Sequence, residues 1–133
     1  MATSFYKHYS DVNPTHWRWP NFTPKEIACK GTGELLIDFA AMDALQDFRG
    51  FVGVPVVVNS GYRSEAYNKK IGGAKNSQHV KGKAFDIRIT KTLTRDMIHK
   101  AAKKAGFRAI GDYPAFVHID TREQPAYWDF RSK

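Results

Sequence analysis

Two histidines and one aspartate in the central part of the sequence have the side chains needed to bind one metal ion. His79 and Asp86 are seven residues apart, and His118 follows in a separate stretch. Imidazole nitrogen and carboxylate oxygen both suit Zn²⁺, and a catalytic zinc keeps one position open for water. A single histidine is more often structural than a ligand, so the spacing alone also allows a structural role. We predict one Zn²⁺ per chain, held by His79, Asp86 and His118.

Two charged residues near these three could complete a hydrolytic site. Zinc lowers the pKa of bound water to about 7, but the chemistry also needs a proton acceptor and a donor for developing negative charge. Asp120 lies two residues after His118, so on a strand it projects from the same face. Arg63 follows a predicted strand, and its forked guanidinium suits a substrate carboxylate or an oxyanion. Together these residues favour metal-assisted hydrolysis of a peptide bond.

Short segments with β-branched or alternating apolar residues are predicted as strands. In residues 83–89, Phe85, Ile87 and Ile89 alternate with small or polar side chains, which places Asp86 on the face opposite the apolar one. The other predicted strands cover residues 55–59, 107–110 and 116–120. We therefore expect Asp86 and His118 on two strands of one sheet, with His79 at the end of the loop that precedes the first.

Helix start and stop signals predict helices around these strands. Thr23 and Glu26 form a capping-box pattern. An apolar stripe at three- and four-residue steps predicts a long helix over residues 34–51. On another predicted helix, His99 is expected to face solvent. The remaining helical segments are expected at residues 24–30, 64–70 and 94–105. The predicted fold class is α+β, with helices packed on a small, mostly antiparallel sheet.

Length and composition fit one domain that spans residues 1–133. Residues 1–22 are interpreted as an extended N-terminal segment, and residues 121–133 as a tail that partly packs against the domain. The longest apolar run, residues 51–58, is too short to cross a membrane, and the N-terminus lacks the apolar segment of a secretory signal. Cys29 is the single cysteine and is expected to be a buried apolar side chain.

The charge balance points to a polyanionic partner. The formal net charge is +8 and the pI is about 9.7. Such a charge favours nucleic acid, an acidic membrane surface or an anionic cell wall. The basic residues are spread along the chain without the arm or tail typical of nucleic-acid binding. We therefore expect neither nucleic acid nor membrane as a partner.

The combined motifs resemble a known family of peptidases. Ser77-x-His79-x-x-Gly-x-Ala-x-Asp86 is preceded by Ser-Gly-Tyr-Arg-Ser at residues 60–64 and followed by Phe-Val-His-Ile-Asp at residues 116–120. This pattern is similar to the zinc D-Ala-D-Ala carboxypeptidases, a family that includes bacteriophage L-alanyl-D-glutamate endopeptidases. This family shares its fold with lysostaphin-type peptidases and the hedgehog signalling domain. The resemblance runs from about residue 22 to residue 122.

The resemblance implies a role for several residues. It assigns zinc binding to His79, Asp86 and His118, and substrate contacts to three residues near them: Arg63, Ser77 and Gln78. The implied substrate is the peptide stem of bacterial peptidoglycan. The bond that is cut stays open between D-Ala-D-Ala, L-Ala-D-Glu and a cross-bridge.

One position departs from the family pattern. Several members carry a catalytic Glu or Asp three residues before the last zinc histidine, where this sequence has Ala115. The catalytic base must then come from elsewhere. Asp120 is the first candidate, with the alternative that it only orients a metal ligand. Asp112 is the second, because a turn could fold it over the zinc. Arg122 is expected to be a surface or structural charge.

These observations lead to two hypotheses of function. The first is a monomeric zinc metallopeptidase that hydrolyses the peptidoglycan stem peptide, in the manner of a phage or prophage endolysin. Such an enzyme would be cytoplasmic at synthesis and would act on the cell wall after release. The second is a zinc-stabilised module that binds cell wall or protein without catalysis, which the alanine at position 115 favours.

Overall fold

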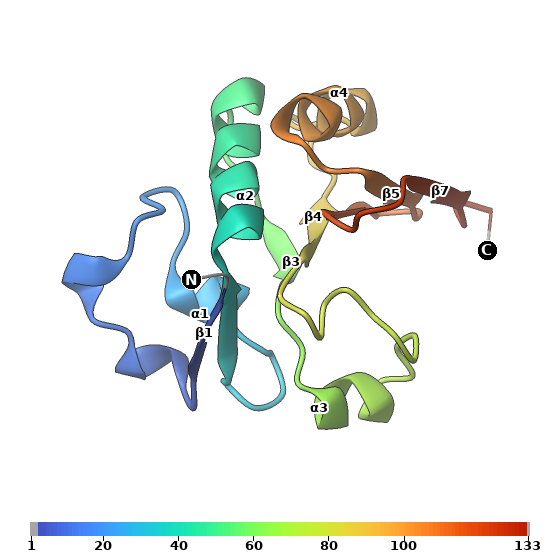
Figure 1. The fold of residues 1–133 in the computed structure, drawn as a ribbon. Helices are drawn as coiled ribbons and strands as arrows, with labels where there is room; N and C mark the ends of the chain where they lie inside the picture. The colour runs from blue at the N-terminus through green and yellow to red at the C-terminus, as the bar shows by residue number, and fades with distance from the viewer. Residues whose placement is uncertain (1–2, 133) are drawn as a thin grey trace.

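The main sheet of the protein has five strands in the order β3–β4–β6–β5–β7 (Figure 1). The computed structural model describes residues 3–132. Strand β7 runs parallel to β5, and the other neighbours are antiparallel. The strands are β3 (Val58–Ser60), β4 (Ala84–Arg88), β5 (Ala109–Asp112), β6 (Phe116–Asp120) and β7 (Ala126–Asp129). The α+β class and the mostly antiparallel sheet are confirmed.

Local capping signals explain where the helices begin and end. At α1 (Pro24–Ile27), Glu26 N donates to Thr23 Oγ1 and Thr23 N to the Glu26 carboxylate, which is the predicted capping box. Thr94 caps α4 (Arg95–Ala105) with a single hydrogen bond, which its hydroxyl accepts from Met97 N. The other two helices are α2 (Phe39–Val52) and α3 (Glu65–Lys70).

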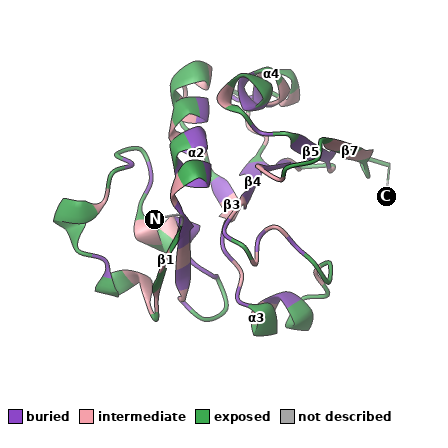
Figure 2. Cartoon of the chain, viewed as in Figure 1, coloured by how far each residue is buried: buried purple, intermediate pink, exposed green. Residues whose placement is uncertain are grey.

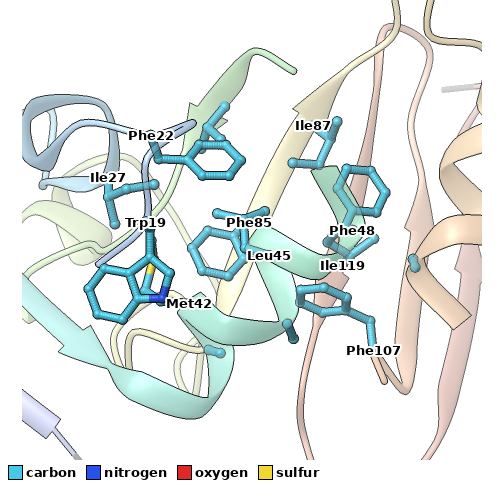
Figure 3. Packing of buried hydrophobic residues seen from close by; sticks show 14 of the residues in the cluster. Trp19, Phe22, Ile27, Met42, Leu45, Phe48, Phe85, Ile87, Phe107 and Ile119 are labelled. Atoms are coloured by element: carbon cyan, nitrogen blue, oxygen red, sulfur yellow. The ribbon is translucent and has the colours of Figure 1, made fainter. Parts of the chain in front are cut away.

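The core lies between the sheet and the pair formed by α2 and α4, which pack against each other (Figure 1). Buried residues line the sides of both helices that face the sheet (Figure 2). Phe107 packs edge-on against Phe48 of α2 and Phe85 of β4, with ring centroids 6.4 and 6.2 Å apart (Figure 3). Residues such as Phe85 and Ile119 fill this face, so their neighbours Asp86 and His118 project from the opposite face.

The predicted helix over residues 34–51 is wrong in its first turn. Leu35–Asp38 forms strand β2, which pairs antiparallel with β1 (Thr3–Tyr6) in a separate two-stranded sheet. The helix begins at Phe39, because the carboxylate of Asp38 accepts a hydrogen bond from Ala41 N at 2.9 Å and caps it. The apolar residues before Asp38 suit either a helix or a strand, and the pairing with β1 decides between them.

Both terminal segments are more ordered than we expected. The N-terminal segment contains β1 and two short 3₁₀ turns, and the buried Trp19 donates its indole N–H to Asp43 at 2.9 Å. The tail contains β7, which the sequence did not reveal as a strand. Cys29 is buried, as expected. Within residues 3–132, none of the helices has the length and hydropathy needed to span a bilayer.

Candidate metal centre

The three predicted ligands lie together in the structure. Asp86 on β4 is directly opposite His118 on β6, and His79 reaches them from the loop before β4. Asp86 Oδ1 lies 3.2 Å from His79 Nε2 and 3.1 Å from His118 Nδ1. All three side chains are buried, and one ligand atom from each lies within 4.8 Å of the others. One cation can therefore contact all three.

The second nitrogen of each imidazole ring is already engaged. His79 Nδ1 lies 2.7 Å from the carbonyl oxygen of Gly61, and His118 Nε2 lies 2.7 Å from Asp120 Oδ2. With a metal bound, each ring would carry its proton on the nitrogen that faces this outer acceptor and would offer the lone pair of the other nitrogen, which is Nε2 in His79 and Nδ1 in His118. These are the two nitrogens that face Asp86. The two outer acceptors therefore suit the tautomers that bind a metal.

Close packing holds the Gly61 carbonyl next to His79. A Cβ atom at Gly61 would lie 2.6 Å from the carbonyl oxygen of Ile27, so this position accommodates glycine alone. The same Ile27 oxygen accepts a hydrogen bond from Tyr62 N at 2.8 Å. The end of α1 therefore fixes the chain that follows β3, and through it the orientation of the His79 ring.

Arg63 contacts the other oxygen of Asp86. Its Nη2 lies 3.4 Å from Asp86 Oδ2, while Nε and Nη1 donate to Ser60 and Asn68. The 3.4 Å separation is long for a charge-assisted hydrogen bond. Burial opposes the charge on Asp86, but the hydrogen bonds from His118 and His79 outweigh it and lower the pKa of this carboxyl. Asp86 is therefore held as a carboxylate with Oδ1 toward the histidines.

Ser77 and Gln78 lie beside the cluster, where the resemblance implies substrate contacts. The buried Ser77 hydroxyl accepts a hydrogen bond from His79 N at 3.1 Å, so it shapes the turn that presents His79. The side chain of Gln78 is partly exposed and borders the same pocket. Arg63, Ser77 and Gln78 are thus all within the site, and their contact with a substrate stays a prediction.

Asp120 lies behind His118 rather than over the open side of the cluster. It is fully buried: Oδ1 accepts two hydrogen bonds from Arg122, and Oδ2 accepts one from Arg122 and contacts His118 Nε2. Burial opposes its charge, but the bonds from His118 and Arg122 lower the pKa of Asp120 to about 2. Burial likewise opposes the charged ring of His118, yet Asp120 and Asp86 raise its pKa. This placement suits the alternative role of orienting a metal ligand, and the role of Asp120 as catalytic base stays a prediction.

Asp112 lies on the other face of the sheet. It pairs in register with Val117, so its side chain points toward α4, away from His118. There it accepts hydrogen bonds from Arg95, His99 and Tyr127 at 2.7–2.8 Å. The expectation that a turn folds Asp112 over the metal is therefore contradicted, because the residue is the last of β5. His99, expected in solvent, is instead its partner.

A pocket of about 580 Å³ opens above the cluster. Arg63, Ser77 and Gln78 line one part of it. The rest includes four aromatic side chains that sequence reasoning did not assign to the site: Tyr113, Phe116, Trp128 and Phe130. Arg122 also borders the pocket, and its guanidinium lies 5.2 Å from the ring centroid of Trp128. The aromatic run in the tail was the signal available for Trp128 and Phe130, but it predicted packing rather than a site.

The donor set fits a zinc ion. Two imidazole nitrogens and one carboxylate oxygen match the three-ligand sets of catalytic zinc, and the pocket leaves room for a fourth ligand. The carbonyl of Gly61 and the carboxylate of Asp120 supply the outer hydrogen bonds that such histidines usually make. The structure thus contains both the ligands and their supports.

Comparison with known proteins points to one family. The family model described as "Peptidase M15" matches residues 20–120. The peptidoglycan L,D-endopeptidase MepK of Escherichia coli (strain K12) is 39% identical over 94 residues, which are 64% of this chain and 51% of MepK. A probable peptidoglycan L,D-endopeptidase MepK of Haemophilus influenzae is 34% identical over 84 residues, covering 58% of this chain and 45% of that protein. The zinc D-Ala-D-Ala carboxypeptidase of Streptomyces albus G is 30% identical over 79 residues, covering 59% of this chain and 29% of that protein.

The chain thus spans about half the length of the MepK relatives that it matches. The family model, in contrast, covers the segment that contains Arg63, His79, Asp86, His118 and Asp120. The predicted resemblance is confirmed at the level of the family. The chain belongs to the peptidase M15 family.

Proposed function

We propose that this chain is a zinc-dependent peptidase that hydrolyses a peptide bond in peptidoglycan. The observation that carries the proposal is the His79–Asp86–His118 cluster, in which the second nitrogen of each histidine faces an outer acceptor and the cluster lies beneath an open pocket. Family membership and the names of the relatives support the same reaction class. A zinc ion bound there would lower the pKa of water and polarise the scissile carbonyl.

The chain's own residues divide the remaining tasks. Asp120 and the Gly61 carbonyl orient the histidines, and Arg63 holds Asp86 while it borders the pocket. The guanidinium of Arg63 is suited to a substrate carboxylate, of which the peptidoglycan stem has several. The volume of the pocket suits a short stretch of peptide.

We favour an endopeptidase over a carboxypeptidase. The two relatives named L,D-endopeptidases are 39% and 34% identical to this chain, whereas the relative named a carboxypeptidase is 30% identical. Digestion of purified peptidoglycan, followed by mass spectrometry of the released fragments, would identify the bond. We expect cleavage within the stem between an L and a D residue. Release of terminal D-alanine alone would instead indicate a carboxypeptidase.

A matched pair of variants separates the site from the fold in that assay. His118→Ala should abolish cleavage, because it removes a ligand. His99→Ala removes a histidine that also contacts an aspartate, but on the far face of the sheet, and should retain most of the activity. Equal activity of the two variants would contradict the proposal.

A zinc-stabilised binding module without catalysis is the second candidate. Ala115 is exposed at the position where, by the resemblance, several members of the family carry an acid, and among the described residues that line the pocket the one carboxylate is Asp86. This candidate predicts that protein with one zinc per chain sediments with peptidoglycan but releases no fragment. Any EDTA-sensitive fragment would exclude it.

We further propose that the protein acts on the cell wall as a phage-type endolysin made in the cytoplasm and active as a monomer. The net charge of +8 supports this proposal, since it would attract the chain to an anionic wall. Wall lysis should then weaken as salt is raised, because the Debye length falls from about 10 Å at 0.1 M to about 3 Å at 1 M. Lysis that is independent of salt would count against a role for the charge.

A further inference from the structure

Tyr113 occupies a fixed position on the wall of the pocket. It follows β5 in the turn to β6, and its backbone N–H donates to the Phe116 carbonyl at 3.1 Å. Its ring stacks on Phe116 with centroids 4.5 Å apart and an angle of 7°, and Phe130 packs edge-on at 5.6 Å. These contacts restrict both the backbone and the ring, so the hydroxyl points in one direction.

A hydrogen bond from Trp128 determines what the Tyr113 hydroxyl can do. Trp128 Nε1 lies 3.0 Å from the Tyr113 oxygen. An indole N–H can only donate, so the phenol oxygen is the acceptor and its own hydrogen must point elsewhere. Within residues 3–132 no protein acceptor for that hydrogen is found. Tyr113 therefore presents an uncommitted donor to the pocket.

Trp128 links this hydroxyl to the metal ligands. Its ring lies 5.1 Å from the ring of His118, and the Arg122 guanidinium lies 5.2 Å from its centroid. A Cβ atom at Gly111 would lie 2.3 Å from the indole, so glycine at that position gives the ring its place on the sheet. The strand that carries Trp128, β7, lies beyond residues 20–120, which the family model matches.

Three other polar side chains on the wall already take part in hydrogen bonds within the protein. Arg63 and Arg122 donate to Asp86 and Asp120, and the Ser77 hydroxyl accepts from His79 N. Asp86 is needed for the metal. Tyr113 thus has a hydroxyl hydrogen that is free to donate and a ring that its neighbours hold in place. Stabilisation of a developing negative charge requires both.

We propose that the Tyr113 hydroxyl donates a hydrogen bond to the carbonyl oxygen of the scissile peptide bond as that oxygen gains negative charge, with Trp128 as its positioning residue. The inference rests on the proposed peptidase function. In the step concerned, the oxygen of water forms a bond to the carbonyl carbon and the π electrons of the C=O bond move onto the carbonyl oxygen. Tyr113 keeps its proton. When the C–N bond breaks, the electron pair on the carbonyl oxygen re-forms the C=O bond, and the nitrogen leaves as an amine with the proton that water released.

Tyr113→Phe tests the proposal by removing a single oxygen atom. The steady-state rate should fall at least about 10-fold in kcat with little change in KM, because the bond forms in the transition state. Affinity for a phosphinate analogue of the stem peptide, measured by calorimetry, should fall by a similar factor. Zinc content should stay at one per chain.

Tyr127→Phe is the matched control. It removes a tyrosine hydroxyl from the same strand as Trp128, but that hydroxyl donates to Asp112 on the far face. Its kcat and analogue affinity should stay within about 2-fold of the wild type. Trp128→Phe should lower kcat less than Tyr113→Phe does, and the double variant should be no worse than Tyr113→Phe alone, because both changes remove one interaction.

Two results would overturn the inference in distinguishable ways. If the wild type is active but Tyr113→Phe retains its kcat and its analogue affinity, Tyr113 makes no such bond and the peptidase function stands. If the zinc-loaded wild type neither cleaves peptidoglycan nor binds the analogue, the proposed function fails and the role of Tyr113 fails with it.

Discussion

Replacing Asp120 by asparagine should weaken zinc binding without unfolding the protein. The carboxylate of Asp120 accepts hydrogen bonds from His118 Nε2 at 2.7 Å and from Arg122 at 2.7–3.0 Å. Asparagine keeps one acceptor oxygen and replaces the other by an NH₂ group. If the NH₂ group faces His118, the ring must carry its proton on Nδ1, which is the nitrogen that the metal needs. If it faces Arg122, two donors oppose each other.

The expected size of the effect follows from similar outer contacts in metal sites. Removing such a carboxylate typically weakens metal binding 10- to 100-fold, which is about 1.4 to 2.7 kcal/mol. The assay is competition for zinc against a chromogenic chelator at neutral pH, with thermal unfolding of the metal-free proteins measured in parallel.

The chain offers a close control for this variant. Asp129 accepts from Arg131 at 3.0, 2.9 and 2.7 Å, the same three bonds that join Asp120 to Arg122, but its side chain is on the surface. Asp129→Asn should leave the zinc affinity unchanged. The reasoning is refuted if Asp120→Asn binds zinc as tightly as the wild type, or if Asp129→Asn weakens binding equally.

Three further predictions test the supports of the site. Gly61→Ala should destabilise the fold by about 1–3 kcal/mol in thermal or denaturant unfolding, because the new Cβ would meet the Ile27 carbonyl. Gly50→Ala is the control: it lies in α2, a Cβ there would meet no atom within 4 Å, and the change should be neutral or stabilising. Zinc affinity should fall by about tenfold per pH unit once the pH is low enough to protonate the His118 ring, because the raised pKa of this ring means that zinc must displace a proton. Calorimetry in two buffers of different ionisation enthalpy measures the displaced proton. A zinc affinity that is independent of pH would contradict the raised pKa. Thr23→Ala should lower the free energy of unfolding by about 1 kcal/mol, because it removes the cap of α1, and it should leave zinc affinity unchanged. If this variant loses zinc binding, α1 controls the site more strongly than its contact with Gly61 and Tyr62 indicates.

Helices and strands whose ends are marked by nearby capping residues, or whose faces are marked by alternating apolar residues, were predicted from the sequence. Thr94 and Gly106 bracket α4, and the alternation around Asp86 identifies β4 and its polar face. These features depend on neighbouring residues. The spacing made His79, Asp86 and His118 candidate ligands, and the resemblance to a peptidase family assigned them to zinc.

The features that were missed depend on residues distant in sequence. Leu35–Asp38 forms a strand because β1, about thirty residues earlier, pairs with it. The position of Trp128 depends on the parallel pairing of β7 with β5, which short strands do not reveal. Asp120 was placed on the correct face of the sheet, but the sequence does not show that His118 turns Nε2 toward it and Nδ1 toward the cluster.

The most direct test of the proposed function is a stepwise zinc titration of EDTA-stripped protein while fragment release from purified peptidoglycan is measured. If His79, Asp86 and His118 hold one catalytic zinc, activity should be absent at first, rise in proportion to added zinc and level off at one equivalent per chain. Under the same conditions His118→Ala should neither bind the equivalent nor gain activity. Full activity in the stripped protein, or one tightly bound zinc without any fragment release, would contradict the proposed zinc peptidase.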